Sequence, residues 1–202
     1  MAIRKFSTAS ISTGSKSSKF WDQTTAVYTP TYHQIATTTS PSGSSYTFSN
    51  IPSDYDHLEL RIFAKDGRSP VYSFLSFQVN GDTGSNYFTL APQVDTRTGS
   101  PYGGESVNAT NIGYIPIAGG SGSNYWGSGT IKFLDYSNSA RNKTAIYNGG
   151  YVGFGDGTSE LGIITQGMGQ WRNTNAINSI RCFAISNFAS GTRLSLYGIK
   201  GA

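Results

Sequence analysis

A chain of 202 residues is long enough for one domain, or for one domain with an appendage. Only 13% of the residues are charged, whereas 37% are hydrophobic and 13% aromatic, and this balance excludes a coiled coil, a charged helical bundle and ordinary disorder. Glycine (25 residues) and tyrosine (13 residues) are abundant and the strong helix formers are scarce, so the composition predicts a β-rich protein.

The formal net charge of +4 is concentrated at the amino terminus, ahead of the first acid, Asp22. Residues 1–30 are rich in Ser and Thr and have no sustained hydrophobic period, so we expect an extended arm that ends at Pro30. Such an arm fits a solvated tail, a nucleic-acid-binding tail or a segment that docks on an acidic partner, and its large aromatic residues favour the third. The residues expected to bind the partner are Arg4, Lys5, Phe6, Lys16, Lys19, Phe20 and Trp21.

Beyond Pro30, short strand-like segments alternate with turns rich in Gly, Asn and Ser. Residues 57–64 have a two-residue hydrophobic period that predicts a half-buried strand. Residues 71–79 repeat this period and stop at Asn80-Gly81, a turn signal because both residues readily adopt positive φ. The other expected strands are residues 33–39, 45–49, 111–118, 129–136, 144–153, 162–168, 177–185 and 193–200.

Two segments do not follow this pattern. Residues 95–108 are expected to form a polar loop, and residues 140–147 are the only candidate for a turn of helix. No motif recurs at a fixed period, which excludes propellers and solenoids. The sequence therefore predicts an all-β, jelly-roll-like β-sandwich of about eight to ten antiparallel strands over residues 31–202, with room for two four-stranded sheets, preceded by the arm.

The sequence offers no evident active site. His33 and His57 are the only histidines, so a zinc site of three histidines is excluded. His57 lies among Asp54, Asp56 and Glu59, which suits either a carboxylate–histidine acid–base pair or a polar turn leading into a strand. The polar turn is favoured, because alternate residues of the strand that follows must face solvent. The eleven acids are spread thinly along the chain and do not indicate the paired carboxylates of a glycosidase.

The other residues that could serve a catalytic or binding site also suit purely structural roles. Cys182, the only cysteine, excludes an intramolecular disulfide and a thiolate zinc site, and its place in an alternating strand predicts a buried or interface residue. Residues 80–86 and 155–160 offer oxygen atoms to calcium without the spacing of a known calcium loop. Aromatic residues suited to sugar stacking or to packing are Tyr125, Trp126 and Trp171. We expect no catalytic residue, cofactor or metal.

No apolar run approaches the length of a transmembrane helix, and no apolar stretch follows the basic amino terminus as in a secretory signal. We therefore expect a soluble chain made in a cytosol, without a membrane anchor.

Four stretches carry a family resemblance: IRKFSTASISTGSKSSKFWDQ, FSNIPSDYDHLELRIFAKD, FQVNGDTGSNYF and the ending GQWRNTNAINSIRCFAISNFASGTRLSLYGIKGA. They resemble virion proteins of tailed bacteriophages that infect cyanobacteria and other aquatic bacteria. The similarity covers nearly the whole chain and is weakest around residues 95–125. Its motifs are structural, so the resemblance implies a non-enzymatic virion component without specifying which one.

The resemblance implies two roles. The first is a head decoration (cement) protein that binds and stabilises the major capsid shell through its arm and sandwich after assembly in the host cytoplasm. The second is a tail fibre or receptor-binding protein that recognises host surface polysaccharide. The modest length and the lack of repeats favour the first. The abundant aromatic residues predict a homotrimer, and neither nucleic acid nor membrane is expected as a partner.

Overall fold

The computed structural model describes residues 31–68, 71–96, 99, 101–120, 124–154 and 160–200. These residues form fourteen β-strands and no helix, which confirms the predicted all-β class. No helix capable of crossing a membrane occurs among them. The strands are β1 (Tyr32–Thr39), β2 (Ser45–Phe48), β3 (His57–Ala64), β4 (Tyr72–Val79), β5 (Tyr87–Leu90), β6 (Gln93–Asp95), β7 (Pro101–Tyr102), β8 (Glu105–Ala109), β9 (Ile112–Ala118), β10 (Gly127–Leu134), β11 (Lys143–Phe154), β12 (Glu160–Trp171), β13 (Ile180–Phe183) and β14 (Arg193–Ile199).

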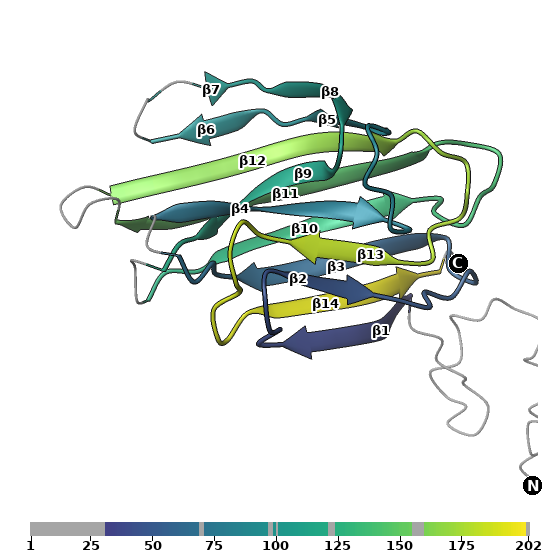
Figure 1. Cartoon of the computed structure of the whole chain (residues 1–202), viewed down its shortest axis with the longest axis horizontal. Helices are drawn as coiled ribbons and strands as arrows, with labels where there is room; N and C mark the ends of the chain where they lie inside the picture. The colour runs from purple at the N-terminus through teal and green to yellow at the C-terminus, as the bar shows by residue number, and fades with distance from the viewer. Residues whose placement is uncertain are drawn as a thin grey trace, which may run out of the picture. The chain divides into compact units, whose positions relative to one another are not determined.

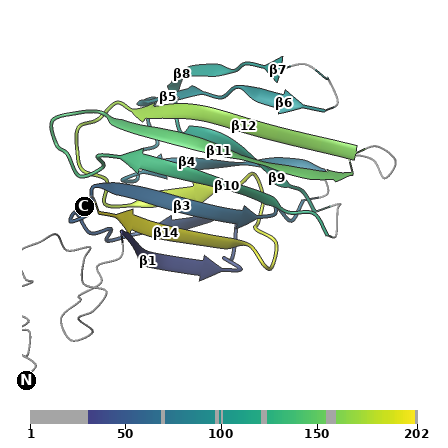
Figure 2. The same cartoon turned by 180° about the vertical axis from the view of Figure 1, so that it is seen from behind.

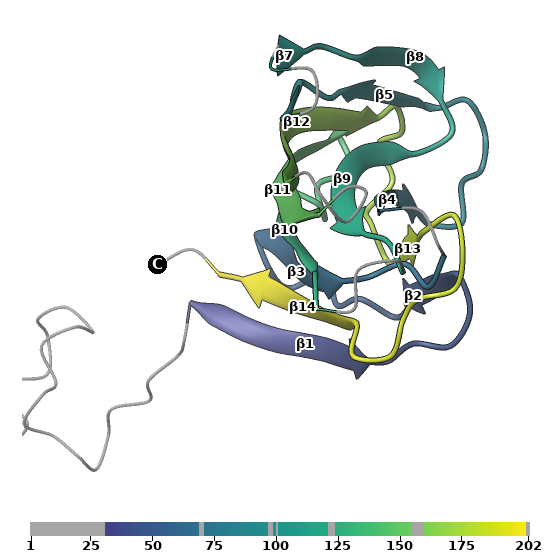
Figure 3. The same cartoon turned by 90° about the vertical axis from the view of Figure 1, so that its left-hand side faces the viewer.

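The strands form two antiparallel sheets that face each other as two layers (Figure 3). The larger sheet has ten strands in the order β1-β14-β3-β10-β11-β12-β5-β8, with β6 paired to β12 and β7 to β6 (Figures 1 and 2). The smaller sheet has the order β2-β13-β4-β9. The arrangement is that of a β-sandwich, as predicted, but the strands divide into ten and four instead of two sets of four. The finer jelly-roll assignment stays a prediction.

The core lies between the two sheets and follows the alternation read from the sequence. Leu58, Leu60 and Ile62 of β3 are buried on the face that looks toward the smaller sheet. From the opposite layer, Leu75 and Phe77 of β4 are fully buried as well. Successive strand residues point to opposite faces, so every second side chain of these strands enters the core.

Glycines on the inner face of the larger sheet allow β9 to approach closely. A Cβ atom at Gly149 would lie 2.6 Å from Cγ2 of Ile115, and one at Gly129 would lie 2.9 Å from the same methyl group. At Gly127 the nearest atom would be Cα of Ile117, at 2.5 Å. Any side chain on these glycines would therefore force the two layers apart where β9 crosses β10 and β11.

The segment 87–109 differs most from the sequence prediction. Residues 95–108 were predicted as a polar loop, whereas β7 and β8 lie there, and β5 and β6 directly precede them. These strands extend the larger sheet beyond β12 (Figure 1). The backbone hydrogen bonds of a strand form whatever the polarity of its side chains. A polar strand at a sheet edge therefore pairs with its neighbour without the two-residue hydrophobic period by which strands were predicted from the sequence.

Residues 140–147, the only candidate for a turn of helix, form none, and β11 begins at Lys143, close to the strand predicted at residues 144–153. The ammonium group of Lys143 is buried and donates hydrogen bonds to the carbonyl oxygens of Asn138, Arg141 (2.7 Å) and Thr174 (2.9 Å). Burial lowers the pKa of Lys143, although the charge of Asp135 opposes this shift. Lys143 thus ties two loops to the start of β11.

Candidate functional site

The face of the larger sheet that points away from the smaller sheet, here called the outer face, is turned toward the viewer in Figure 2. Among the described residues, every exposed large hydrophobic side chain except Ile185 lies on it. Val152 is 73% exposed and Ile164 is 61% exposed. Monomeric soluble proteins rarely expose large contiguous apolar patches, so this face is the strongest candidate for a functional surface.

One end of the outer face carries a group of large aliphatic side chains, here called the apolar ridge. Ile146 of β11 pairs directly with Met168 of β12, which in turn pairs with Leu90 of β5. All three side chains are more than one-third exposed. The complete apolar ridge consists of Leu90, Val107, Leu134, Ile146 and Met168.

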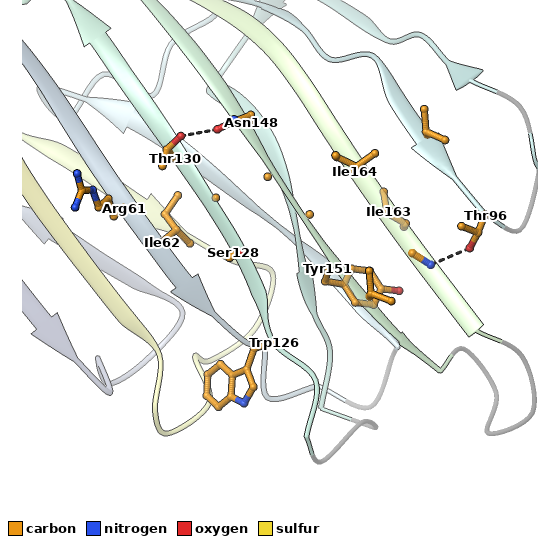
Figure 4. A pocket seen from close by; sticks show the side chains of 16 residues that line it. Arg61, Ile62, Thr96, Trp126, Ser128, Thr130, Asn148, Tyr151, Ile163 and Ile164 are labelled. Atoms are coloured by element: carbon orange, nitrogen blue, oxygen red, sulfur yellow. Dashed lines mark hydrogen bonds between the residues drawn. The ribbon is translucent and has the colours of Figure 1, made fainter.

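Toward the other end of the same strands, a groove of about 790 Å³ lies on the outer face (Figure 4). Ser128 of β10 and Gly150 of β11 are direct partners across the sheet and, having little or no side chain, form its floor. The side chains that rise around this floor belong to Arg61, Val94, Thr96, Trp126, Thr130, Asn148, Val152 and Ile164.

Of the three aromatic residues considered for sugar stacking, only Trp126 belongs to this groove. Its indole ring stacks on Phe63, with ring centroids 4.8 Å apart and an interplanar angle of 12°. Tyr125 packs instead against the small cluster around Tyr151 and Leu161. The aromatic pair holds the indole at the end of the groove shown at the bottom of Figure 4.

Trp171, the third of these residues, is buried and stabilises a loop. Its Nε1 donates a 2.7 Å hydrogen bond to Oδ2 of Asp82. The Asn86 amide donates to the same oxygen, and the Gly84 backbone nitrogen donates to Oδ1. Burial alone would raise the pKa of Asp82, but these bonds outweigh it and lower the pKa. The Asp82 carboxylate is thus engaged by protein donors, which supports turn chemistry over the calcium alternative for residues 80–86. The turn itself has the predicted positive φ at Asn80, 53°.

Polar side chains line the β3 side of the groove. The Thr130 hydroxyl donates a hydrogen bond to Oδ1 of Asn148, which leaves the Asn148 amide nitrogen as a donor at the surface (Figure 4). The Arg61 guanidinium lies over the ring of Tyr197, 4.6 Å from its centroid, and over the ring of Tyr32 at 5.3 Å. These contacts fix the orientation of Arg61 at the groove.

Glu59 holds the charged groups of this region in place. Its Oε1 accepts a 2.8 Å hydrogen bond from Nε of Arg61, and its Oε2 lies 3.2 Å from Nζ of Lys132. The Tyr32 hydroxyl donates to the same carboxylate. Burial alone would raise the pKa of Glu59, but the bonds from Arg61 and Lys132 lower it, so the carboxylate stays ionised. Glu59 points outward as the period predicts, yet it is only 4% exposed because these neighbours cover it.

The two histidines do not come together. His33 pairs with Gly198 on the inner side of the larger sheet, whereas His57 lies on its outer face. Nδ1 of His57 accepts a hydrogen bond from the backbone nitrogen of Asp135, at 3.0 Å. With Glu59 bound to Arg61, the observed contacts fit the polar start of a strand, which the sequence favoured over an acid–base pair.

Cys182 is fully buried in β13, as expected, and burial raises the pKa of its thiol. No group of three or more His, Cys, Asp or Glu side chains suited to a metal ion occurs in the described part of the chain. Within the second calcium candidate, residues 155–159 lie outside the described residues, as does the whole expected arm with its partner-binding residues, namely Arg4, Lys5, Phe6, Lys16, Lys19, Phe20 and Trp21.

The groove and the apolar ridge were not predicted as sites. Arg61, Thr130 and Asn148 come from three strands and meet only through the sheet register. One signal in the sequence could have indicated them. Residues 161–168 place apolar side chains on both faces of the strand, whereas a strand with one face in water alternates between apolar and polar residues.

Comparisons with models of protein families, with curated proteins and with solved structures find no match to this chain. The resemblance to phage virion proteins therefore stays a prediction.

Proposed function

We propose that this chain is a non-enzymatic structural subunit of a tailed-phage virion, and specifically a head decoration protein that binds the capsid shell. The sandwich contributes to this contact through the apolar ridge. The observation that carries the proposal is the concentration of exposed large hydrophobic side chains on the outer face. The resemblance described above supplies the virion context.

The physical argument is the cost of leaving this face in water. Complete burial of a large aliphatic side chain stabilises a protein by about 1.5–3 kcal/mol. The side chains of the apolar ridge are roughly half buried against their neighbours in the sheet, so about half of this stabilisation is already present in the isolated subunit. Five such residues together leave several kcal/mol of burial free energy that contact with another protein surface would recover in part. Exposed apolar patches mark interaction surfaces, and a subunit of a permanent assembly buries such a patch against its neighbour.

A double variant, Ile146→Glu with Met168→Glu, tests the proposal. Both side chains point outward and are 40% and 48% exposed, so the fold should tolerate the change while the contact becomes charged. Because the two glutamates stand directly opposite each other and repel, thermal unfolding verifies that the double variant is folded. Ile185→Glu is the matched control, because Ile185 is 66% exposed and lies outside the outer face. The measurement is occupancy on purified phage particles that lack this protein.

We expect at least a tenfold loss of occupancy for the double variant and none for Ile185→Glu. Equal occupancy of wild type and double variant would contradict a role of the apolar ridge. Copy number in intact particles separates the head role from the alternative tail role: hundreds of copies fit a decoration protein, and a few dozen or fewer fit a tail component.

A further inference from the structure

The groove differs from the apolar ridge in its chemistry, and this difference points to another ligand. A volume of about 790 Å³ lies within the range of small-molecule sites and accommodates a few sugar rings. Its lining combines apolar side chains, such as Trp126 and Val152, with the hydroxyl groups of Ser128 and Thr130. Sugars present apolar C–H faces together with hydroxyl groups, so a mixed lining of this kind suits them.

The polar groups of the groove are ordered before any ligand binds. Thr130 and Asn148 hold each other by a hydrogen bond, and the Asn148 amide nitrogen remains able to donate. Phe63 stacks on Trp126 and holds the indole in position. A preorganised site loses less conformational entropy on binding, which matters for a ligand as flexible as a polysaccharide.

Positive charge gathers on the β3 side of the groove. Glu59 is the only acidic residue in β1, β14, β3 and β10, whereas these strands contain Arg61, Lys132 and Arg193. Nε of Arg61 is bound to Glu59, but the side chain is still 52% exposed and lines the groove. Arg193 is the direct partner of Phe63 in the neighbouring strand. Of these three cations only Arg61 lines the groove, so a carboxylate beside its guanidinium group would gain charge-assisted hydrogen bonds.

We infer that the groove binds an acidic polysaccharide, with an apolar sugar face toward Trp126 and a carboxylate toward Arg61. This inference does not depend on the proposed function, because the apolar ridge lies at the other end of the strands. The remaining occupant to be tested is a protein: a second subunit covering the groove together with the apolar ridge.

The variant Ser128→Tyr tests the inference, since it fills the floor of the groove from an exposed, outward-facing position. Thr39→Tyr is the matched control, an exposed strand residue paired with Arg193 at the edge of the same sheet, outside the groove lining. The probes are oligogalacturonate and the same oligosaccharide with its carboxyl groups reduced to alcohols. Binding is measured by titration calorimetry, and thermal unfolding verifies that each variant is folded.

We expect the wild type and Thr39→Tyr to bind oligogalacturonate with equal affinity, and Ser128→Tyr to bind it at least tenfold more weakly. The wild type should bind the reduced oligosaccharide at least tenfold more weakly than oligogalacturonate. Equal binding of both probes would overturn the role of the carboxylate. Failure of the wild type to bind both probes, or unchanged affinity for oligogalacturonate in Ser128→Tyr, would overturn the site. Loss of particle occupancy in Ser128→Tyr without any saccharide binding would assign the groove to a protein contact instead. A variant with Ile146→Gln and Met168→Gln removes the apolar side chains of the ridge without adding charge beside the groove, and it should keep wild-type saccharide affinity. A failure at the apolar ridge is therefore distinguishable from a failure at the groove.

Discussion

Replacement of Gly169 by alanine tests the close contact between the two sheets. Gly169 lies in β12 on the inner face, where an added Cβ would fall well under 3.0 Å from Cγ2 of Ile112 in β9. Its two next-nearest atoms belong to the same isoleucine, both at 3.3 Å. Because Ile112 is fully buried and packed on all sides, it has no free space into which to move.

The expected cost of Gly169→Ala is that of overpacking a core, about 1–3 kcal/mol in the free energy of unfolding. For a domain of this size each kcal/mol lowers Tm by about 2–4 °C, so a decrease of roughly 2–12 °C should follow. Urea denaturation monitored by tryptophan fluorescence gives the free energy, and calorimetry gives Tm.

Two further variants test the explanation itself. Gly162→Ala is a control in the same strand, because its Cβ would meet no atom closer than 3.6 Å, and its stability should stay equal or rise slightly. Ile112→Leu removes the Cγ2 methyl group, so in the Gly169→Ala background it should recover about 1 kcal/mol relative to additivity. A Gly169→Ala protein as stable as wild type, or a double variant with additive losses, would refute the steric argument.

Two other predictions concern buried charges. Lys143→Met leaves the carbonyl groups of Arg141 and Thr174 without their donor, so it should lower the free energy of unfolding by about 2–3 kcal/mol in urea denaturation. The control Lys200→Met, at an exposed position, should lower it by less than about 0.5 kcal/mol. Equal losses would contradict the role of Lys143. The pKa of Glu59 is lower in the folded protein than its ordinary 4.5, so ionised Glu59 stabilises the fold above about pH 4.5 and this contribution is lost as the pH falls through the folded pKa. Glu59→Gln should therefore lower stability by about 1 kcal/mol at pH 7, with a difference from wild type that shrinks under acidic conditions; a pH-independent difference would count against the ion pairs.

The sequence by itself determined the features that depend on local chemistry. The two-residue period of 57–64 predicted both the strand and the burial of Leu58, Leu60 and Ile62, because alternation places every second side chain on one face. Asn80-Gly81 predicted the turn, since both residues adopt positive φ at little cost. The alternating strand around Cys182 likewise predicted a buried thiol.

Only the tertiary structure decided what depends on strand register. Ser128, Gly150 and Ile164 are far apart in the chain, and they adjoin because β10, β11 and β12 pair in one particular register. A shift of one residue would move every side chain of a strand to the other face, so neither the groove nor the apolar ridge is encoded in any single segment. Gly129 and Gly149 lie in strands that the sequence predicted, but the need for glycine at these positions could not be predicted, because it depends on the approach of Ile115 of β9, which belongs to the opposite layer.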